Sequence, residues 1–394
     1  MSFNQVDFYK QHHQLFSQLG DEKYVCFDVL MLDRAKVKAI QQAARSVWQV
    51  LLQAGEVMKT LSDSELLDFG YPVETFDVIR LPQPLPFIAR CDFAVTENGI
   101  YLLECNAEVA TFIVETFRIN GIVANHFGVQ DVNRGAVSIL KRELNKYLKT
   151  AAKSINKKPE HCHIVFSSLS EAPEDIATVE YLRALCAYEA TFCPIEAISM
   201  DETGAYDQND RQIDIAYRLY PTEWMVEDKD PTSGVALWDV LELLILNKKL
   251  ALVNPMSAFV LQNKALMALI TQQWGQDSSH PLANSVKRHF LPTYLDADSL
   301  DYPYVAKPTY GREGMEVEII RQSEDKLYNR STAYAAFPKI YQEFVELPTV
   351  ELGGSPYTLQ FSCFLVNGVP IGLGARVGDV VIDNTSSFLA LGYS

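Results

Sequence analysis

The sequence predicts a fold that mixes α and β structure, and three observations lead to this class. Over residues 32–61 (LDRAKVKAIQQAARSVWQVLLQAGEVMKTL), apolar residues recur at helical spacing. Around Glu97-Asn98-Gly99, two short runs within 88–108 have the composition of neighbouring strands. The last third of the chain is dominated by strand-like segments. We therefore expect an α+β or mixed α/β chain with an antiparallel C-terminal part.

The first half supplies most of the predicted helices. Asp33 is a suitable N-cap for the helix that follows it. The proline-rich LPQPLPF at 81–87 interrupts helical structure and leads into extended chain. Residues 136–158 (AVSILKRELNKYLKTAAKSINKK) predict a long amphipathic helix. A strand and a helix then alternate at about 160–200 (HCHIVFSS, then DIATVEYLRALCAYE), which predicts a small parallel α/β unit.

A polar, turn-rich segment divides the chain into two expected regions. Residues 201–214 (DETGAYDQNDRQID) are a candidate boundary or an exposed loop. We expect 1–205 to hold the helical region, the hairpin and the α/β unit. We expect 206–394 to hold two helices, one over VALWDVLELLILNKK and one that begins near Asn263, followed by a glycine-containing loop and an antiparallel sheet.

The composition of the chain limits the kinds of partner that it can bind and indicates its cellular compartment. The 394 residues include 34 Lys and Arg against 50 Asp and Glu, a net charge of -16, which argues against a broad basic face for nucleic acid and against docking on anionic membranes. A small cation such as a polyamine or Mg²⁺ suits this charge, although acidity also serves solubility alone. The sequence has no apolar run long enough to span a membrane and no export signal at its start. Its 7 scattered cysteines form no C-x-x-C pair, which favours reduced thiols and a cytoplasmic protein.

Four polar groups gather in the predicted hairpin. Alternate side chains of a strand share one face, so Arg90 lies with Asp92, and Glu104 lies with Asn106. If the two pairs meet, two carboxylates and an amide form an oxygen-rich site of the kind that Mg²⁺ prefers, and the neighbouring arginine can hold a carboxylate or a phosphate. The alternative is a solvent-exposed face with cross-strand ion pairs.

The turn of this hairpin decides whether the pairs meet. A two-residue Asn-Gly turn sends them to opposite faces, whereas a three-residue loop with Gly99 left-handed places Asp92 opposite Glu104. Both turns are common, but the three-residue loop separates polar from apolar residues far better. We therefore expect that register, with Leu102 on the polar side and Leu103 on the apolar side.

Phosphate-binding candidates follow in the second half. Lys307 ends a strand-like run just before a loop that contains Gly311 and Gly314, where an ammonium and backbone N–H groups can converge on one anion. The Lys-Pro pair is also common punctuation at a strand end. Lys264 is at the predicted start of a helix, where it can bind an anion or be an ordinary solvent-exposed lysine. Gln342 and Glu343 alternate with apolar neighbours and can border a nucleobase or belong to an edge strand.

In their order along the chain, these pieces resemble a known family. The order is Arg90-x-Asp92, Glu104-x-Asn106-Ala107, Asn263-Lys264, Val305-Ala306-Lys307-Pro308, Gly311-Arg312-Glu313-Gly314 and Tyr341-Gln342-Glu343. Together with RLYPTEWM (218–225) and the C-terminal GLGARVGDVVIDNTSSFLALGY, this set resembles the synthetase part of the glutathionylspermidine synthase family, an ATP-grasp ligase group. The resemblance covers about 80–394 and implies an ATP-grasp fold preceded by a region like the pre-ATP-grasp domain.

The resemblance implies an activity and assigns roles to residues. It implies a ligase that joins a carboxylate to an amine, such as a polyamine, through an acyl phosphate, with Mg²⁺ and ATP. By this resemblance Asp92, Glu104 and Asn106 are metal ligands, Arg90 contacts the substrate and the phosphate, and Arg376 stabilises the charge of the transferred phosphate. Lys264 and Lys307 bind the phosphates of ATP. Gly311 and Arg312 lie in the loop over the active site, and Gln342 and Glu343 border the adenine.

Two departures from the family and two rival functions complete the expectations. Part of the family carries an N-terminal cysteine amidase domain, which this sequence lacks, so we expect no amide-cleaving half. Val109 stands where the founding enzymes are richer in hydroxyl residues, so the resemblance implies the reaction class rather than glutathione as the substrate. The rivals are a regulatory module that binds ATP without turnover and an ATP-dependent kinase of a small molecule.

Overall fold

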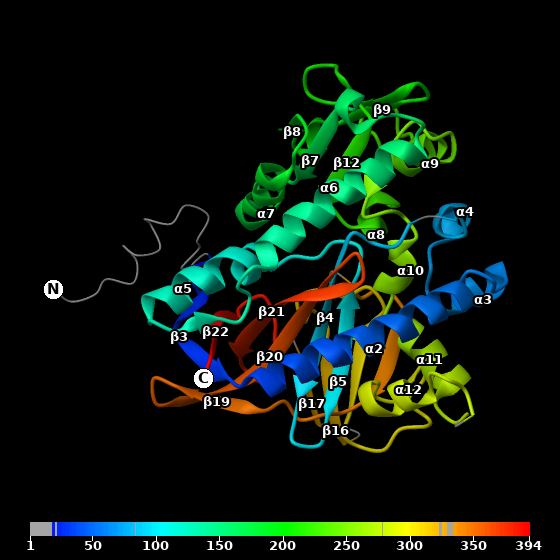
Figure 1. Cartoon of the computed structure of the whole chain (residues 1–394). Coiled ribbons are helices and arrows are strands. Elements are labelled where there is room, and N and C mark those ends of the chain that lie inside the picture. Colours follow the sequence, from blue (N-terminus) through cyan, green and yellow to red (C-terminus); the bar gives the residue numbers. More distant parts are fainter. Residues whose placement is uncertain (1–17, 20–21, 83, 278, 323–324, 329–333) are drawn as a thin grey trace.

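The computed structural model describes residues 18–19, 22–82, 84–277, 279–322, 325–328 and 334–394 (Figure 1). Two larger sheets, a four-stranded parallel sheet and the helices between them make a mixed α/β fold, as the sequence predicts. Of the helices in these ranges, none combines the length and the apolar character that a membrane span requires.

The largest sheet joins the two ends of the chain. Its order is β3 (Val25–Leu32), β22 (Ser387–Tyr393), β21 (Val369–Gly378), β20 (Ser355–Val366), β4 (Ile88–Val95) and β5 (Ile100–Asn106), with β19 (Thr349–Leu352) on β20 and β6 (Gln130–Asp131) on β22. The pairs are antiparallel except β22 with β3, which is parallel. The predicted hairpin therefore lies beside the predicted C-terminal antiparallel strands.

Helices cover both faces of this sheet, because alternate residues of each strand point to opposite layers. On one face lies α2 (Arg34–Met58), whose N-cap Asp33 accepts a hydrogen bond from the Lys36 N–H, as predicted. Cys363 and Leu365 belong to the core cluster that includes this helix. Phe364 and Val366 belong instead to a cluster with α6 (Ala136–Ser154) and the segment around η2 (Glu115–Ile119) and α5 (Asn120–His126).

A second sheet is antiparallel throughout. Its order is β14 (Thr293–Tyr294), β18 (Lys339–Glu343), β15 (Tyr304–Pro308), β16 (Glu318–Gln322) and β17 (Asp325–Tyr328). Three helices adjoin it or the long helix α2: α10 (Ala258–Gln262), α11 (Leu266–Trp274) and α12 (Ala283–His289). The helix expected to begin near Asn263 is α11, which begins at Leu266, and Asn263 and Lys264 link it to the preceding helix α10.

The small α/β unit forms as predicted and is larger than predicted. Its parallel sheet has the order β13 (Ala251–Val253), β12 (Ile215–Leu219), β7 (Ile164–Ser168) and β8 (Ala190–Phe192), with α7 (Pro173–Leu185), α8 (Thr222–Met225) and α9 (Leu237–Leu246) around it. In Figure 1 this unit is the green upper part. The polar segment 201–214 lies within the unit, among the short strands β9 (Ser199–Asp201), β10 (Gly204–Tyr206) and β11 (Gln212–Ile213). The division into 1–205 and 206–394 stays a prediction.

Short elements complete the described chain. They are β1 (Gln18–Leu19), β2 (Glu22–Lys23), α3 (Asp63–Asp68), η1 (Val73–Thr75), α4 (Phe76–Ile79), η3 (Pro159–His161) and η4 (Ile195–Ala197).

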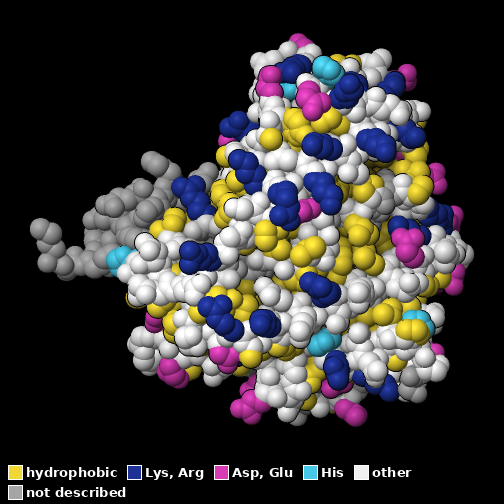
Figure 2. All heavy atoms as spheres, viewed as in Figure 1, with side chains coloured by type: hydrophobic (Ala, Val, Ile, Leu, Met, Phe, Trp, Pro, Cys, Tyr) yellow, Lys and Arg dark blue, Asp and Glu magenta, His cyan; other side chains and the backbone are white. Residues whose placement is uncertain are grey.

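Charge is unevenly spread over the surface. Figure 2 shows a face on which Lys and Arg side chains outnumber Asp and Glu, despite the net charge of -16. On this side lies α6, whose sequence AVSILKRELNKYLKTAAKS has one acidic residue, the buried Glu143, among its basic ones. The net charge is thus an average that does not describe this face.

Candidate active site

The β4–β5 hairpin brings its four polar groups together. Arg90 pairs with Asn106 and Asp92 pairs with Glu104, which confirms the predicted register at this end of the hairpin. Asp92 is fully buried and Arg90 is 5% exposed. The alternative of a solvent-exposed face is therefore wrong.

The turn of the hairpin differs from the prediction. Val95 pairs with Ile100, the Thr96 N–H donates to the Gly99 carbonyl, and Gly99 is not left-handed. One extra residue on β5 compensates, because the register shifts between Asp92 and Phe93. Because of this bulge, Leu102 and Leu103 each lie on the face opposite to the predicted one. Leu102 belongs to the apolar core, and Leu103 lines a cavity.

Asp92 is held by two arginines and a serine. Its carboxylate accepts from Arg90 Nε at 2.9 Å and from Arg90 Nη2 at 2.9 Å. Ser362 Oγ, on the neighbouring strand β20, donates to it at 2.7 Å. Arg376 Nη2, from β21, lies 3.6 Å away. The sheet thus brings Arg376 to the hairpin, and its guanidinium lies over the ring of Phe112, 5.9 Å from the ring centroid.

Glu104 is the more accessible of the two carboxylates. Its side chain is 24% exposed and lies 3.3 Å from Lys264 Nζ. Burial opposes its ionisation, but the positive charges of Lys264, Arg90 and Lys307 outweigh this and hold the pKa of Glu104 well below its usual value. Asn106 Nδ2 donates to Glu104 at 3.1 Å and lies 3.4 Å from Asp92.

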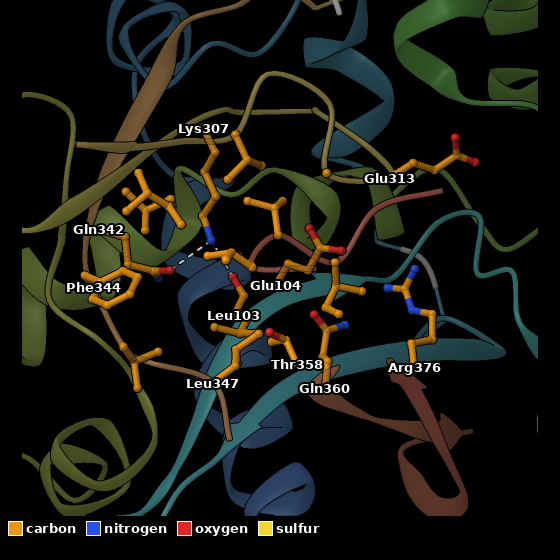
Figure 3. Close-up of a pocket in the computed structure, with 18 of the residues that line it drawn as sticks. Leu103, Glu104, Lys307, Glu313, Gln342, Phe344, Leu347, Thr358, Gln360 and Arg376 are labelled. Carbon is orange, nitrogen blue, oxygen red and sulfur yellow. Dashed lines mark hydrogen bonds between the residues drawn. The ribbon is translucent and has the colours of Figure 1, made fainter. Parts of the chain in front are cut away.

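Two lysines face Glu104 from the other side. Lys307, at the end of β15, donates to the Leu103 carbonyl at 2.7 Å and to Gln342 Oε1 at 2.8 Å (Figure 3). Burial, together with the charge of Lys264, lowers the pKa of Lys307 to about 7. Lys264 Nζ donates to the Gly311 carbonyl, while its backbone N–H donates to Thr309 O. The Lys264 N–H is therefore already paired, and the expected role of the Lys264 side chain in phosphate binding stays a prediction.

Arg312, in the loop after β15, contacts two carboxylates other than Glu104, which the lysines face. Arg312 Nε donates to Glu223 at 2.9 Å, and its Nη2 lies 3.9 Å from Glu108. Arg312 thus lies in the loop beside the cavity with its guanidinium held by carboxylates, and its expected role over the active site stays a prediction. Gly314 has φ +68°, and a Cβ there would meet the Ile382 carbonyl at 2.8 Å, so only glycine fits this position.

A cavity of about 390 Å³ lies between the hairpin, β20–β21, and the β15–β18 sheet (Figure 3). Most of the predicted site residues line it, namely Arg90, Glu104, Asn106, Lys307, Arg312, Gln342, Glu343 and Arg376. The other three, Asp92, Lys264 and Gly311, do not line it but contact residues of the set. Gln342 is buried, with Nε2 donating to Thr293 Oγ1 at 3.0 Å, whereas Glu343 is exposed.

Sequence reasoning missed several residues of the site. Thr358 and Gln360 of β20 line the cavity, and Ser362 continues the same face of that strand. Their alternation in TLQFS is a usable signal, but it becomes specific only once β20 is known to lie against β4. Glu108 is fully buried and receives Arg218 of β12, a contact across 110 residues that no local pattern reveals.

The donor chemistry of the hairpin fits a divalent cation. Asp92 does not line the cavity and its oxygens already accept from Arg90 and Ser362, so Glu104 supplies the accessible carboxylate, with Asn106 beside it. Its NH₂ group faces both carboxylates, so cation binding requires the amide to present its oxygen instead. Within the described ranges, no group of three His, Cys, Asp or Glu residues could hold a metal, so further ligands would have to come from substrate or water.

Comparisons with known proteins match this chain along most of its length. A curated relative from Haemophilus influenzae, named "Putative acid--amine ligase", is 26% identical over 318 residues, which is 76% of this chain and 72% of the relative. Solved structures share the fold. A glutathione synthetase-like effector from Globodera pallida has a TM-score of 0.62 at 10% identity, covering 98% of this chain and 95% of its own.

A second solved structure agrees. It is titled a "Putative gamma-glutamylcysteine synthetase" from Methylobacillus flagellatus, with a TM-score of 0.51 at 9% identity, covering 92% of this chain and 90% of its own. The ATP-grasp type of fold, expected from the resemblance, is thus confirmed. The family model for the glutathionylspermidine synthase preATP-grasp family matches residues 5–392. The chain therefore belongs to the glutathionylspermidine synthase preATP-grasp family.

Proposed function

We propose that this protein is an ATP-dependent ligase that joins a small carboxylic acid to an amine. One observation carries the proposal: Arg90, Glu104, Asn106 and Arg376 line the same cavity as Lys307 and Gln342. The residues proposed to clamp the carboxylate and those proposed to bind phosphate are thus side by side. Family membership and the relative named as an acid–amine ligase support an amide-forming ligase.

In this proposal ATP occupies the cavity from the β15–β18 side. Lys307, which lines the cavity, and Lys264, which lies beside Glu104, neutralise its phosphates, and Gln342 and Glu343 border its base. Arg312 and Gly311 lie in the loop that adjoins the nucleotide. The protonated form of Lys307 can keep its bonds to Leu103 and Gln342 and offer its third N–H to a phosphate oxygen.

The hairpin would hold Mg²⁺ through Glu104, Asn106 and Asp92. When bound, the ion neutralises phosphate charge that the lysines alone leave uncompensated. Arg90 and Arg376 would hold the acid substrate and the phosphoryl group in transfer. Arg90 donates hydrogen bonds to Asp92, so its orientation is set before substrate arrives, and Arg376 lies 3.6 Å from the same carboxylate.

Two steps would form the amide. An oxygen of the substrate carboxylate attacks the γ-phosphorus of ATP, which forms an acyl phosphate and releases ADP. The nitrogen of the amine then attacks the acyl carbon, inorganic phosphate leaves, and the amine nitrogen loses a proton. Positioning and charge neutralisation supply most of the rate enhancement in such phosphoryl transfers.

Release of ADP, measured against panels of carboxylic acids and amines, tests the function. The proposal expects turnover only when an acid and an amine are both present. Sustained turnover with one partner alone would make the protein a kinase. Thermal stabilisation by Mg²⁺-ATP without ADP release under any combination would make it a binding module.

A further inference from the structure

A second cavity lies in the small α/β unit, apart from the ATP cavity. Its volume is about 710 Å³, and it shares no lining residue with the first. It lies between one face of the parallel sheet, α9 and the short strands β9–β11, which group together in the upper part of Figure 1. It includes Ser167 and Leu169 at the carboxyl end of β7, and Arg218 and Tyr220 at that of β12. Ligands of open α/β sheets bind at these strand ends.

The wall of this cavity is mainly apolar. Ile198, Met200, Ile213, Trp238 and Leu252 contribute to it. The volume is in the range of sites that enclose small organic molecules, and such sites are lined by apolar side chains with a few polar groups. A ligand here would therefore have an apolar body.

Among the described residues, two buried polar atoms at the strand ends lack hydrogen-bond partners. Ser167 is 0% exposed and Arg218 is 3% exposed, and they are paired in register on neighbouring strands, so their side chains share the face toward the cavity. In the part of the chain that the structure describes, neither Ser167 Oγ nor Arg218 Nε has a hydrogen-bond partner. Buried polar groups in native proteins are nearly always paired, so these two point to a ligand atom that accepts hydrogen bonds.

Charge balance selects the kind of acceptor. The guanidinium of Arg218 is already neutralised by the buried Glu108, which is fully desolvated. Its Nη1 donates to the Tyr220 carbonyl, and its Nη2 donates to Glu108 and Thr222. A second carboxylate would be an uncompensated buried charge, whereas a neutral carbonyl would satisfy Arg218 Nε at no such cost.

The rim of the cavity has a different charge. Among the described lining residues, Glu196, Asp228 and Asp230 are acidic, and Lys229 is the basic residue besides the buried Arg218. Asp228 also accepts from Tyr220 O–H at 2.9 Å, so it is held in place at the rim. This rim favours a cationic group on the ligand over an anionic one.

We infer that this cavity is a binding site for a small amine whose apolar body carries a neutral amide. The amide carbonyl accepts from Arg218 Nε and Ser167 Oγ, the apolar body packs on α9 and β9–β11, and the ammonium group faces the acidic rim. The inference is independent of the proposed ligase activity, because it concerns a separate cavity and is tested by binding alone.

Three matched probes test the assignment: leucine anilide, which is cationic, N-acetyl-leucine anilide, which is neutral, and N-succinyl-leucine anilide, which is anionic. Binding to the full chain is measured by calorimetry and by quenching of tryptophan fluorescence, since Trp238 lines the cavity. We expect the cationic probe to bind most tightly and the anionic probe least. Failure of all three to bind, or tightest binding by the anionic probe, would overturn the inference.

Variants locate the site. Ser167→Ala should weaken leucine anilide binding by about 5- to 10-fold, the usual effect of one hydrogen bond. Ala216→Leu, which fills the cavity from β12, should abolish it. The control is Ser168→Ala, since the next residue on β7 is equally buried but does not line the cavity. Unchanged affinity in the folded Ser167→Ala variant would refute the site, as would equal losses in the Ser167 and Ser168 variants.

Discussion

The carboxylate of Asp92 is predicted to stabilise the fold as well as the site. It is fully buried and carries the charge that balances Arg90, 2.9 Å away, and Arg376, 3.6 Å away. Asp92→Asn keeps the shape and an acceptor for Ser362 but leaves two buried guanidinium groups without this carboxylate. Removing one partner of a buried ion pair costs about 3–5 kcal/mol, a large part of the roughly 5–15 kcal/mol that stabilises a typical protein.

Glu104→Gln is the matched control. Its side chain is 24% exposed and makes one ion pair, with Lys264 at 3.3 Å. Three cations favour its ionised form but the side chain is partly exposed, so this variant should lose stability, though less than Asp92→Asn. Urea unfolding, followed by tryptophan fluorescence, gives the free energy and the m-value of each protein.

A loss of less than about 1 kcal/mol in Asp92→Asn, or equal losses in the two variants, would refute this account of the buried charges. The expected difference also decides how the metal site should be tested. Loss of activity in an Asp92 variant mixes unfolding with loss of a ligand. Glu104→Gln separates them, and it should raise the Mg²⁺ concentration needed for ATP binding while leaving the protein folded.

Three further predictions concern ATP affinity, the rate of phosphoryl transfer and the stability of the loop that contains Arg312. Burial lowers the pKa of Lys307 to about 7, so its ammonium loses a proton as the pH rises through neutrality, and ATP affinity should fall between about pH 6 and pH 8. The Lys307→Arg variant stays charged, so calorimetry should show a flatter dependence of its ATP affinity on pH. An equally steep dependence in this variant would contradict the assignment of Lys307 to phosphate binding. Arg376→Ala should lower kcat by about 100-fold with little change in ATP affinity, and a pure affinity loss would count against its role in transfer. Glu223→Gln removes the carboxylate that holds Arg312, so hydrogen exchange in 309–317 should speed up, while the exposed control Glu227→Gln should leave it unchanged.

The sequence predicts the pairing of the hairpin's polar residues well because the information there is local. Alternation separates Arg90 and Asp92 from Cys91 and Phe93, and one face of each strand must meet the core. The same logic fails at the turn. A bulge near Leu103 restores the register from a different loop, and nothing in the local sequence distinguishes one extra residue in a strand from one extra residue in a turn.

The rest of the site depends on contacts between distant parts of the chain. Ser362 reaches Asp92 across 270 residues, and Lys307 reaches Leu103 across 204. Which strand lies beside β4 is settled by the packing of both faces of the sheet, which alternation along a single strand does not encode. For the same reason Arg312 could be placed in its loop from the sequence, whereas its bond to Glu223 could not.

The structure of the protein crystallised with Mg²⁺ and a non-hydrolysable ATP analogue tests the central claim most directly. The account predicts the triphosphate against Lys264 and Lys307, and a metal ion about 2.0–2.1 Å from a Glu104 oxygen. An analogue bound outside this cavity, or a bound triphosphate whose metal does not touch Glu104, would contradict it.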